Sequence, residues 1–341
     1  MPPLSRALLV WLTLAAAGCT KAPAIESVAG VAQGTTYALQ WWSARPVDER
    51  ALAAAASGEL ERIDGLLSNY RSDSTLERFN AARSVEPQTL PPELVTLLRL
   101  AVDVHRASDR CFDPTVRPLV NLWGFDGDEP HVPDPAAIAA ALADVGLEKL
   151  EIVDGQTVRK TRPAVEVDMA SIGQGYTVGR LAPVVESFGI DSYVVEIGGE
   201  LLARGRKPGG QPWRIGIENP TADGGVAEPL VMPGDRAVAV ITSGTYRHYF
   251  EDDGRAYGHI LDPRTGRPVE HDLVETTVVG TDPARAAAWA TALLCLGPEE
   301  GARIADREGL AATMAVRSGN SVLRVHSARF AADWAPRPKL P

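Results

Sequence analysis

Apolar residues recur along this chain with two periods. Between residues 47 and 70 they stand at helical spacing, at Leu52, Leu60, Ile63, Leu66 and Leu67, which predicts an amphipathic helix. Further helices are expected at 91–107, 134–145, 181–188 and 282–297. Alternating segments predict strands, and they lie at 34–42, 150–153, 165–168, 192–197, 213–218, 237–242 and 274–279, with a final hairpin at 311–316 and 321–325. Residues 112–132, rich in proline, glycine and aspartate, are expected to form an ordered loop.

Helices and strands are interleaved without an internal repeat, which predicts an α+β architecture of mixed sheets with flanking helices. The chain has 341 residues, 45% of them hydrophobic, a composition typical of globular proteins. Its formal net charge of -10 argues against nucleic acid as a partner, because phosphate backbones are bound by basic patches.

The N-terminus reads as an export signal. Arg6 precedes a short apolar run, and small residues lead directly to Cys19, a pattern that resembles a lipoprotein signal peptide rather than a buried hydrophobic helix. The lipid would be attached to Cys19, and Thr20 in place of an acidic residue indicates retention at the inner membrane, facing the periplasm. The expected boundaries are a signal peptide at 1–18, a tether at 19–27 and a folded domain at 28–335.

Two further cysteines, Cys111 and Cys295, are far apart in the sequence. Because neither belongs to a closely spaced pair, we expect neither a disulfide framework nor a zinc site.

A glycine-bearing helix start occurs in "DMASIGQGYTVG". Glycines at a helix N-terminus admit phosphate close to the backbone, and Glu196 at the end of the next strand suggests a dinucleotide site. The spacing of Gly173, Gly175 and Gly179 departs from G-x-G-x-x-G, so a glycine turn used only for packing is about as good an interpretation.

Polar residues also cluster after the strand at 237–242. Thr242, Ser243 and Gly244 end this strand, and His248 and His259 follow. Both histidines are suited to proton transfer, although a single histidine beside a strand is more often structural. The chain has no serine in a nucleophile elbow, which excludes acyl transfer by that mechanism.

Together these segments resemble the FAD:protein FMN transferase family, the ApbE flavin transferases. The resemblance runs in order over nearly the whole chain after the signal peptide, and the matching segments are "GTTY", "LLSNYRSDSTLERFN", "FDPTVRPLVNLWGF", "VDMASIGQGY", "EIGGELLARG", "WRIGIENP", "ITSGTYRHYFEDDGRAYGHILDPRTGRPVEHDLV" and "AAAWATALLCLGPE".

The resemblance implies an ApbE-like fold and an exported, often lipid-anchored enzyme. Members cleave FAD and join its FMN half, through the phosphate, to a threonine or serine hydroxyl of a target protein, with release of AMP. The targets are exported flavoprotein subunits of membrane redox complexes, and magnesium assists by neutralising the phosphates.

Residue by residue, the resemblance implies roles in one site. His259 is the expected proton-transfer residue. The expected FAD contacts are Gln33, Tyr70, Cys111, Phe112, Asp113, Asp168, Gln174 and Leu261. Metal ligands are expected at Ser171 and Thr291, together with an aspartate one helical turn before Thr291.

The chain departs from the family at that aspartate. Ala287 occupies its position, and Ala290 stands where some members carry a second acid. Residues 287 and 291 share one helix face, so the substitution removes the charged ligand and leaves the hydroxyls of Ser171 and Thr291. Three interpretations follow: a transferase whose metal is completed by water, FAD phosphates or Asp282; an FAD-binding lipoprotein with impaired or lost transfer activity; or a pyrophosphatase that converts FAD to FMN and AMP.

Overall fold

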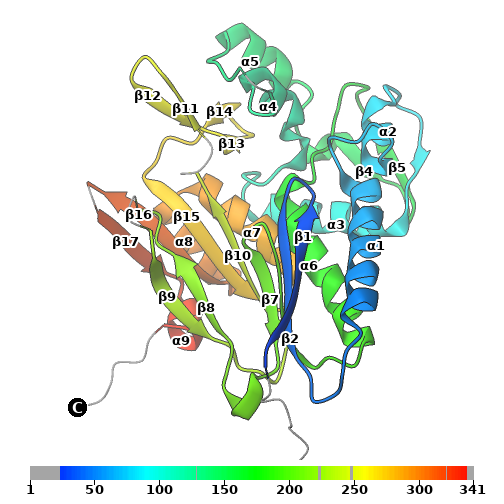
Figure 1. Cartoon of the computed structure of the whole chain (residues 1–341). Coiled ribbons are helices and arrows are strands. Elements are labelled where there is room, and N and C mark those ends of the chain that lie inside the picture. Colours follow the sequence, from blue (N-terminus) through cyan, green and yellow to red (C-terminus); the bar gives the residue numbers. More distant parts are fainter. Residues whose placement is uncertain (1–23, 128, 222–223, 246–248, 320, 336–341) are drawn as a thin grey trace, which may run out of the picture.

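An eight-stranded antiparallel sheet forms the centre of the molecule (Figure 1). The computed structural model describes residues 24–127, 129–221, 224–245, 249–319 and 321–335. In the order in which they pair, the strands of this sheet are β1 (Glu26–Ala32), β2 (Thr35–Trp42), β6 (Ser192–Ile197), β7 (Glu200–Arg204), β10 (Val238–Gly244), β15 (Leu273–Gly280), β16 (Ala311–Ser318) and β17 (Ser321–His326). Its antiparallel hairpins account for the period-2 pattern of the sequence.

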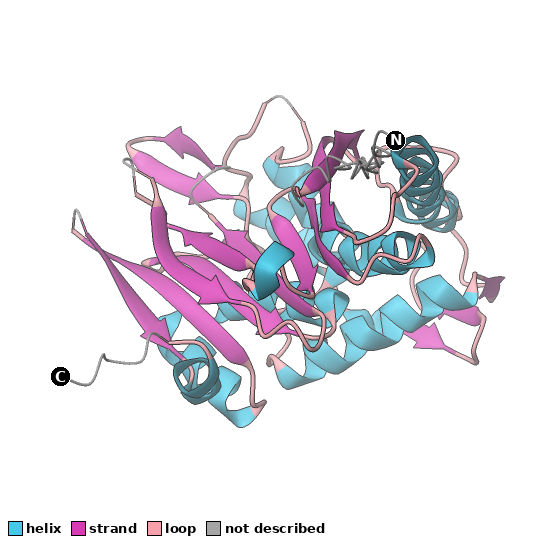
Figure 2. Ribbon diagram, turned by 60° about the horizontal axis from the view of Figure 1, so that its bottom comes forward, coloured by secondary structure: helices cyan, strands magenta, loops and turns pink. Residues whose placement is uncertain are grey.

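Helices cover one face of this sheet (Figure 2). The four that supply most of this layer are α1 (Glu49–Leu67), α3 (Pro92–Ala107), α6 (Ala170–Ser187) and α7 (Pro283–Leu296). Helix α7 is buried on almost every side: nine of the ten residues from Ala286 to Cys295 are buried, and Thr291 is half-buried. The remaining helices are α2 (Thr75–Ala81), α4 (Arg117–Trp123), α5 (Pro135–Leu142), α8 (Pro298–Arg307) and α9 (Ala328–Asp333).

The opposite face of the sheet packs on the hairpin of β8 (Arg214–Glu218) and β9 (Val226–Val231) and on α9. Adjacent residues of β10 divide between the two layers: Ile241 faces the helices, and Val240 faces the hairpin. This is the alternation that a strand imposes on its side chains. The central sheet is therefore buried on both faces.

A smaller cap lies beyond one end of the sheet (Figure 1). Leu119 and Trp123 of α4, Ile138 of α5 and Leu261 form its apolar centre, and Phe250 and Tyr257 stack on each other beside it. The short strands of this region and of a sheet beside α1 are β3 (Gln88–Thr89), β4 (Leu150–Ile152), β5 (Thr157–Lys160), β11 (Tyr249–Asp252), β12 (Arg255–Gly258), β13 (Leu261–Asp262) and β14 (Arg267–Pro268).

The α+β prediction is confirmed, and two local predictions are wrong. The segment 112–132, expected to be a loop, contains a 3-10 turn, Pro114–Val116, and helix α4. Proline is compatible with the first turn of a helix, because the N–H that it lacks would have no partner there. Residues 165–168 are not in a sheet. The Asn80 side chain instead pairs with both backbone groups of Val167, at 2.8 Å each, and so replaces a neighbouring strand.

The N-terminal predictions fall largely outside the described residues. The signal peptide and Cys19 lie within residues 1–23, which the structure does not describe, and β1 begins at Glu26, inside the segment expected as a tether. In the part of the chain that is described, every helix is too short or too polar to span a bilayer.

Candidate functional site

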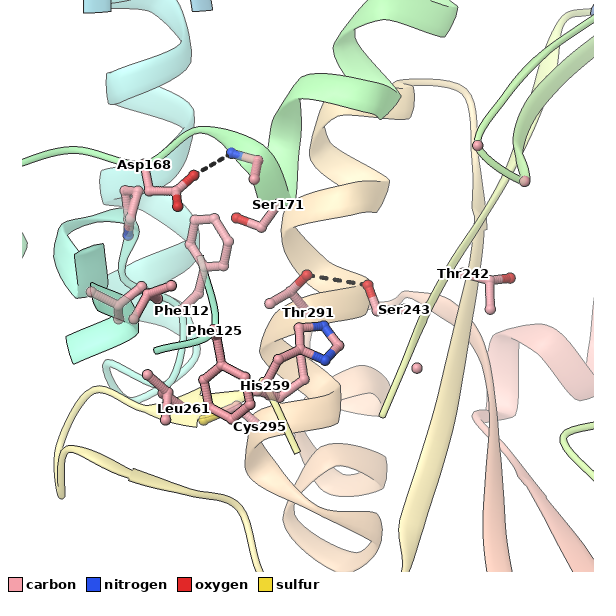
Figure 3. Close-up of a pocket in the computed structure, with 18 of the residues that line it drawn as sticks. Phe112, Phe125, Asp168, Ser171, Thr242, Ser243, His259, Leu261, Thr291 and Cys295 are labelled. Atoms are coloured by element: carbon pink, nitrogen blue, oxygen red, sulfur yellow. Dashed lines mark hydrogen bonds between the residues drawn. The ribbon is translucent and has the colours of Figure 1, made fainter. Parts of the chain in front are cut away.

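A cavity of about 670 Å³ lies between the cap and the end of the central sheet, within the size range of small-molecule sites. Its walls come from sequence-distant segments, and Figure 3 shows the side chains that gather there. The lining residues include Tyr70, Phe112, Asp113, Phe125, Asp126, Asp168, Ala170, Ser171, Gly198, Gly199, Glu218, Thr242, Ser243, Gly244, His259, Leu261, Thr291 and Cys295.

Close packing of α6 on α7 places two hydroxyl residues at this cavity. A methyl group on Gly175 would lie 2.5 Å from the Pro283 carbonyl oxygen and 2.8 Å from Cβ of Ala287, so only glycine fits this crossing. Ser171 stands one turn before Gly175 on α6, and Thr291 stands one turn after Ala287 on α7. Because the helices run antiparallel here, both residues reach the same end, where both line the cavity.

Hydroxyl groups are concentrated at this end. Thr291 Oγ1 and Ser243 Oγ are 3.1 Å apart in a hydrogen bond (Figure 3), and Thr242 Oγ1 is 2.8 Å from Thr277 Oγ1. Such oxygens are suited to hard cations and to phosphate oxygens.

The N-terminus of α6 also opens on the cavity, through Ala170 and Ser171. The positive end of a long helix attracts phosphate. Asp168 Oδ1 accepts a hydrogen bond from the Ala170 N–H at 2.6 Å and another from the Asn69 side-chain amide. Burial raises the pKa of Asp168 above its usual value.

The charged side chains of the cavity wall are all acidic among the described residues. Asp113, Asp126, Asp168 and Glu218 line the cavity, and neither lysine nor arginine does so among the described residues. An anionic ligand with two phosphates therefore needs a cation that these side chains do not supply.

The wall on the cap side is aromatic. Phe112 and Phe125 line it, with the ring of Phe125 edge-on to that of His259 at a centroid distance of 6.5 Å. Tyr70 stands at the rim with 85% of its surface exposed. A flat conjugated ring fits between such side chains.

The Asp113 carboxylate holds the cavity wall in shape. Its Oδ1 accepts hydrogen bonds from the Thr115 N–H and hydroxyl, and its Oδ2 accepts one from the Leu147 N–H at 3.0 Å. His105 Nδ1 lies 3.4 Å from the same carboxylate. Burial raises the pKa of Asp113 even against these bonds. Its contribution to a ligand site is thus through the backbone that it orders.

A disulfide joins Cys111 to Cys295, which corrects the expectation from sequence spacing. The residues are 184 positions apart, yet their Cα atoms are 5.7 Å apart, because the segment before α4 packs against the C-terminal end of α7. The bond ties the aromatic wall to the helix that carries Thr291.

The structure brings together most of the expected site residues. Those that line the cavity are Tyr70, Cys111, Phe112, Asp113, Asp168, Ser171, His259, Leu261 and Thr291. His248 lies outside the described residues.

Four expected residues are not part of the cavity lining among the described residues. Gln33 instead accepts a hydrogen bond from Thr177 at 3.1 Å, and the Gln174 side chain packs against the turn at Gly198. Ala287 and Ala290 are buried in the main core, with 1% and 0% of their surface exposed.

Asp282 caps the far end of α7 by accepting a hydrogen bond from the Arg285 N–H. It lies roughly 13 Å along the helix from Thr291, so the expectation that it completes a metal site is wrong.

Sequence reasoning missed Glu200, the first residue of β7. Its carboxyl is buried with 9% of the residue exposed, and Oε2 has no hydrogen-bond partner among the described residues. The burial of Glu200 could have been inferred from the sequence. Glu200 stands two residues before the buried Leu202, and side chains two apart in a strand point to the same face, here the face that meets the helices.

Comparison with known proteins places these features in a known group. The sequence profile of the ApbE family matches residues 33–314. The FAD:protein FMN transferase of Salmonella typhimurium is 37% identical, with 92% of each chain covered. The crystal structure of the Pseudomonas stutzeri flavinyl transferase ApbE, in its apo form, superposes with a TM-score of 0.83 at 39% identity and covers 92% of this chain and 97% of its own. The flavin transferase ApbE from Vibrio cholerae superposes with a TM-score of 0.82 at 35% identity, covering 91% of this chain and 100% of its own.

Replacing both Cys111 and Cys295 with serine is expected to lower the free energy of unfolding by about 2–4 kcal/mol, the usual contribution of a disulfide that closes a long loop. Urea unfolding of the oxidised wild type and the double variant measures this difference. The two proteins should unfold alike in excess dithiothreitol, and equal stability without reductant would contradict the bond.

Proposed function

The chain belongs to the ApbE family, and on that premise we propose that it is a FAD:protein FMN transferase. The supporting observation is the pairing of two unlike walls in one cavity. Phe112 and Phe125 offer an aromatic side, whereas Ser171, Thr291 and the start of α6 offer hydroxyls and a positive helix end. FAD has the same two parts, a flat conjugated ring and a pyrophosphate.

The reaction is a phosphoryl transfer to an alcohol. The hydroxyl oxygen of an acceptor threonine or serine attacks the phosphorus of the FMN half. The bond from that phosphorus to the bridging oxygen breaks, AMP leaves with this oxygen, and an FMN phosphoester forms on the acceptor. The hydroxyl proton passes to a base, for which the His259 imidazole on the cavity wall is suited.

Magnesium fits the oxygen donors at the sheet end of the cavity. Ser171 and Thr291 would hold it there, and bound magnesium would neutralise the pyrophosphate that no described lysine or arginine on the wall can neutralise. The two hydroxyls carry no charge, so a carboxylate is still needed beside them.

The chain's own residues supply orientation. The aromatic side chains fix the flavin plane. The Gly198–Gly199 turn and the end of β10 at Thr242–Gly244 leave room for the phosphates. The disulfide keeps the two walls at a fixed separation. Holding the reactants in this way lowers the entropic part of the barrier.

The acceptors that this proposal implies are exported flavoprotein subunits of membrane redox complexes. Export and an inner-membrane lipid anchor, with the catalytic domain facing the periplasm, rest on the sequence around Cys19. An enzyme anchored on that surface shares a compartment with such acceptors.

Incubation of the chain with FAD, magnesium and an exported domain that carries an acceptor threonine is expected to increase the acceptor mass by one FMN phosphoester. His259→Ala should slow this transfer by about 100-fold or more while FAD is still bound, because only proton transfer is removed. Intact-mass spectrometry measures the transfer, and quenching of flavin fluorescence measures binding.

Other products would contradict the transferase proposal. Release of FMN and AMP with the acceptor unmodified identifies a pyrophosphatase. Stable FAD binding without turnover, with acceptor and magnesium present, identifies a flavin-binding protein.

Cys19→Ser is expected to move the protein from the membrane fraction to the soluble periplasmic fraction. The cysteine thiol is the site of lipid attachment, and a serine in its place is not lipidated. Fractionation followed by immunoblotting measures the distribution, and unchanged membrane association of the variant would contradict a lipid anchor at this residue.

A further inference from the structure

Glu200 is a buried acid next to the position that lacks one. A methyl group on Gly175 would lie 3.1 Å from Glu200 Oε2 and 2.8 Å from Cβ of Ala287, so the carboxyl and the alanine methyl flank the same point of the helix crossing. The chain therefore retains a carboxylate beside residue 287, supplied by β7 instead of α7.

The surroundings of this carboxyl do not explain why an acid is buried here. Its Oε2 is buried without a hydrogen-bond partner among the described residues, although buried polar groups are normally paired. It lies at the helix crossing, where a Cβ on Gly175 would meet the Pro283 carbonyl oxygen and the Ala287 methyl, and neither of these groups is a hydrogen-bond donor. An acid in such a place is costly unless a cation or a donor joins it.

The two expected hydroxyl ligands stand one helical turn from the residues that flank the carboxyl at the crossing. Gly175 is four residues from Ser171 on α6, and Ala287 is four residues from Thr291 on α7. Each separation is one helical turn, or roughly 6 Å along the helix axis. Ligands at positions i and i+4 of a helix close on one metal ion in known sites. Glu200, which belongs to the sheet, thus lies near the place that a ligand at residue 287 would occupy.

We propose that Glu200 supplies the carboxylate ligand of a divalent-cation site at the junction of α6, α7 and β7, in place of the aspartate that Ala287 lacks. The site takes a hard cation of the magnesium class, and Ser171 and Thr291 complete its protein ligands. This proposal rests on the proposed function for the role of the ion, which is to neutralise the FAD pyrophosphate.

Binding of Mn²⁺, a paramagnetic probe for magnesium sites, tests the proposal. Electron paramagnetic resonance counts free Mn²⁺ in titrations of the purified chain, with and without FAD. Glu200→Gln keeps the shape of the side chain and removes its charge, so the dissociation constant for Mn²⁺ is expected to rise by at least about tenfold. The far-ultraviolet circular dichroism spectrum of the variant should match that of the wild type, which shows that the variant is folded.

Two further variants complete the design. Glu200→Gln combined with Ala287→Asp is expected to recover most of the Mn²⁺ affinity, because the charge returns to the same junction. Glu299→Gln removes an exposed carboxylate of α8 away from the cavity lining and should leave Mn²⁺ affinity close to that of the wild type.

The proposal is overturned if Glu200→Gln binds Mn²⁺ as tightly as the wild type, or if the wild type binds no Mn²⁺ even with FAD present. Failure of the proposed function gives a different result. FAD would then remain unbound or untransferred, while the Mn²⁺ titrations without FAD still separate Glu200→Gln from the wild type.

Discussion

Helices α6 and α7 pack so closely at Gly175 that a Cβ there would lie 2.5 Å from the Pro283 carbonyl oxygen and 2.8 Å from Cβ of Ala287. The site depends on this contact. It sets the antiparallel register in which Ser171 and Thr291 reach the same end of the helix pair. A larger residue at 175 would separate the helices and would move the hydroxyls of Ser171 and Thr291 out of this register.

The second wall of the cavity is held by different means. The aromatic segment from Cys111 to Asp113 is fixed by the hydrogen bonds of the Asp113 carboxylate and by the disulfide to Cys295. Because Cys295 lies on the same helix as Thr291, one turn further on, the flavin-binding wall and the phosphate-binding wall meet at α7. This arrangement suits a reaction in which the ring and the pyrophosphate of one molecule are held at once.

Hydrophobic period was enough to predict much of the fold. The central strands β6, β10 and β15 and the helices α1 and α3 have regular apolar spacing and lie close to their expected positions. The extended segment 165–168 has the same local pattern but is paired by the Asn80 side chain. A contact with a residue so distant in the sequence cannot be read from local spacing, and the same holds for the disulfide.

The site was predicted mainly through its resemblance to a known family. Ser171, His259 and Thr291 meet in the cavity as that resemblance implied. The resemblance also identified the missing aspartate at residue 287, yet it offered no replacement, because Glu200 comes from another strand and only the packed structure shows that it lies at the same crossing.

The central claim is that the cavity holds FAD with its pyrophosphate against a cation at the α6–α7 junction. Crystals grown with FAD and Mn²⁺, measured at the manganese absorption edge, test this most directly. The account predicts one anomalous peak in contact with a pyrophosphate oxygen, Glu200 and Thr291. A peak elsewhere, or FAD bound with no peak at this junction, would contradict it.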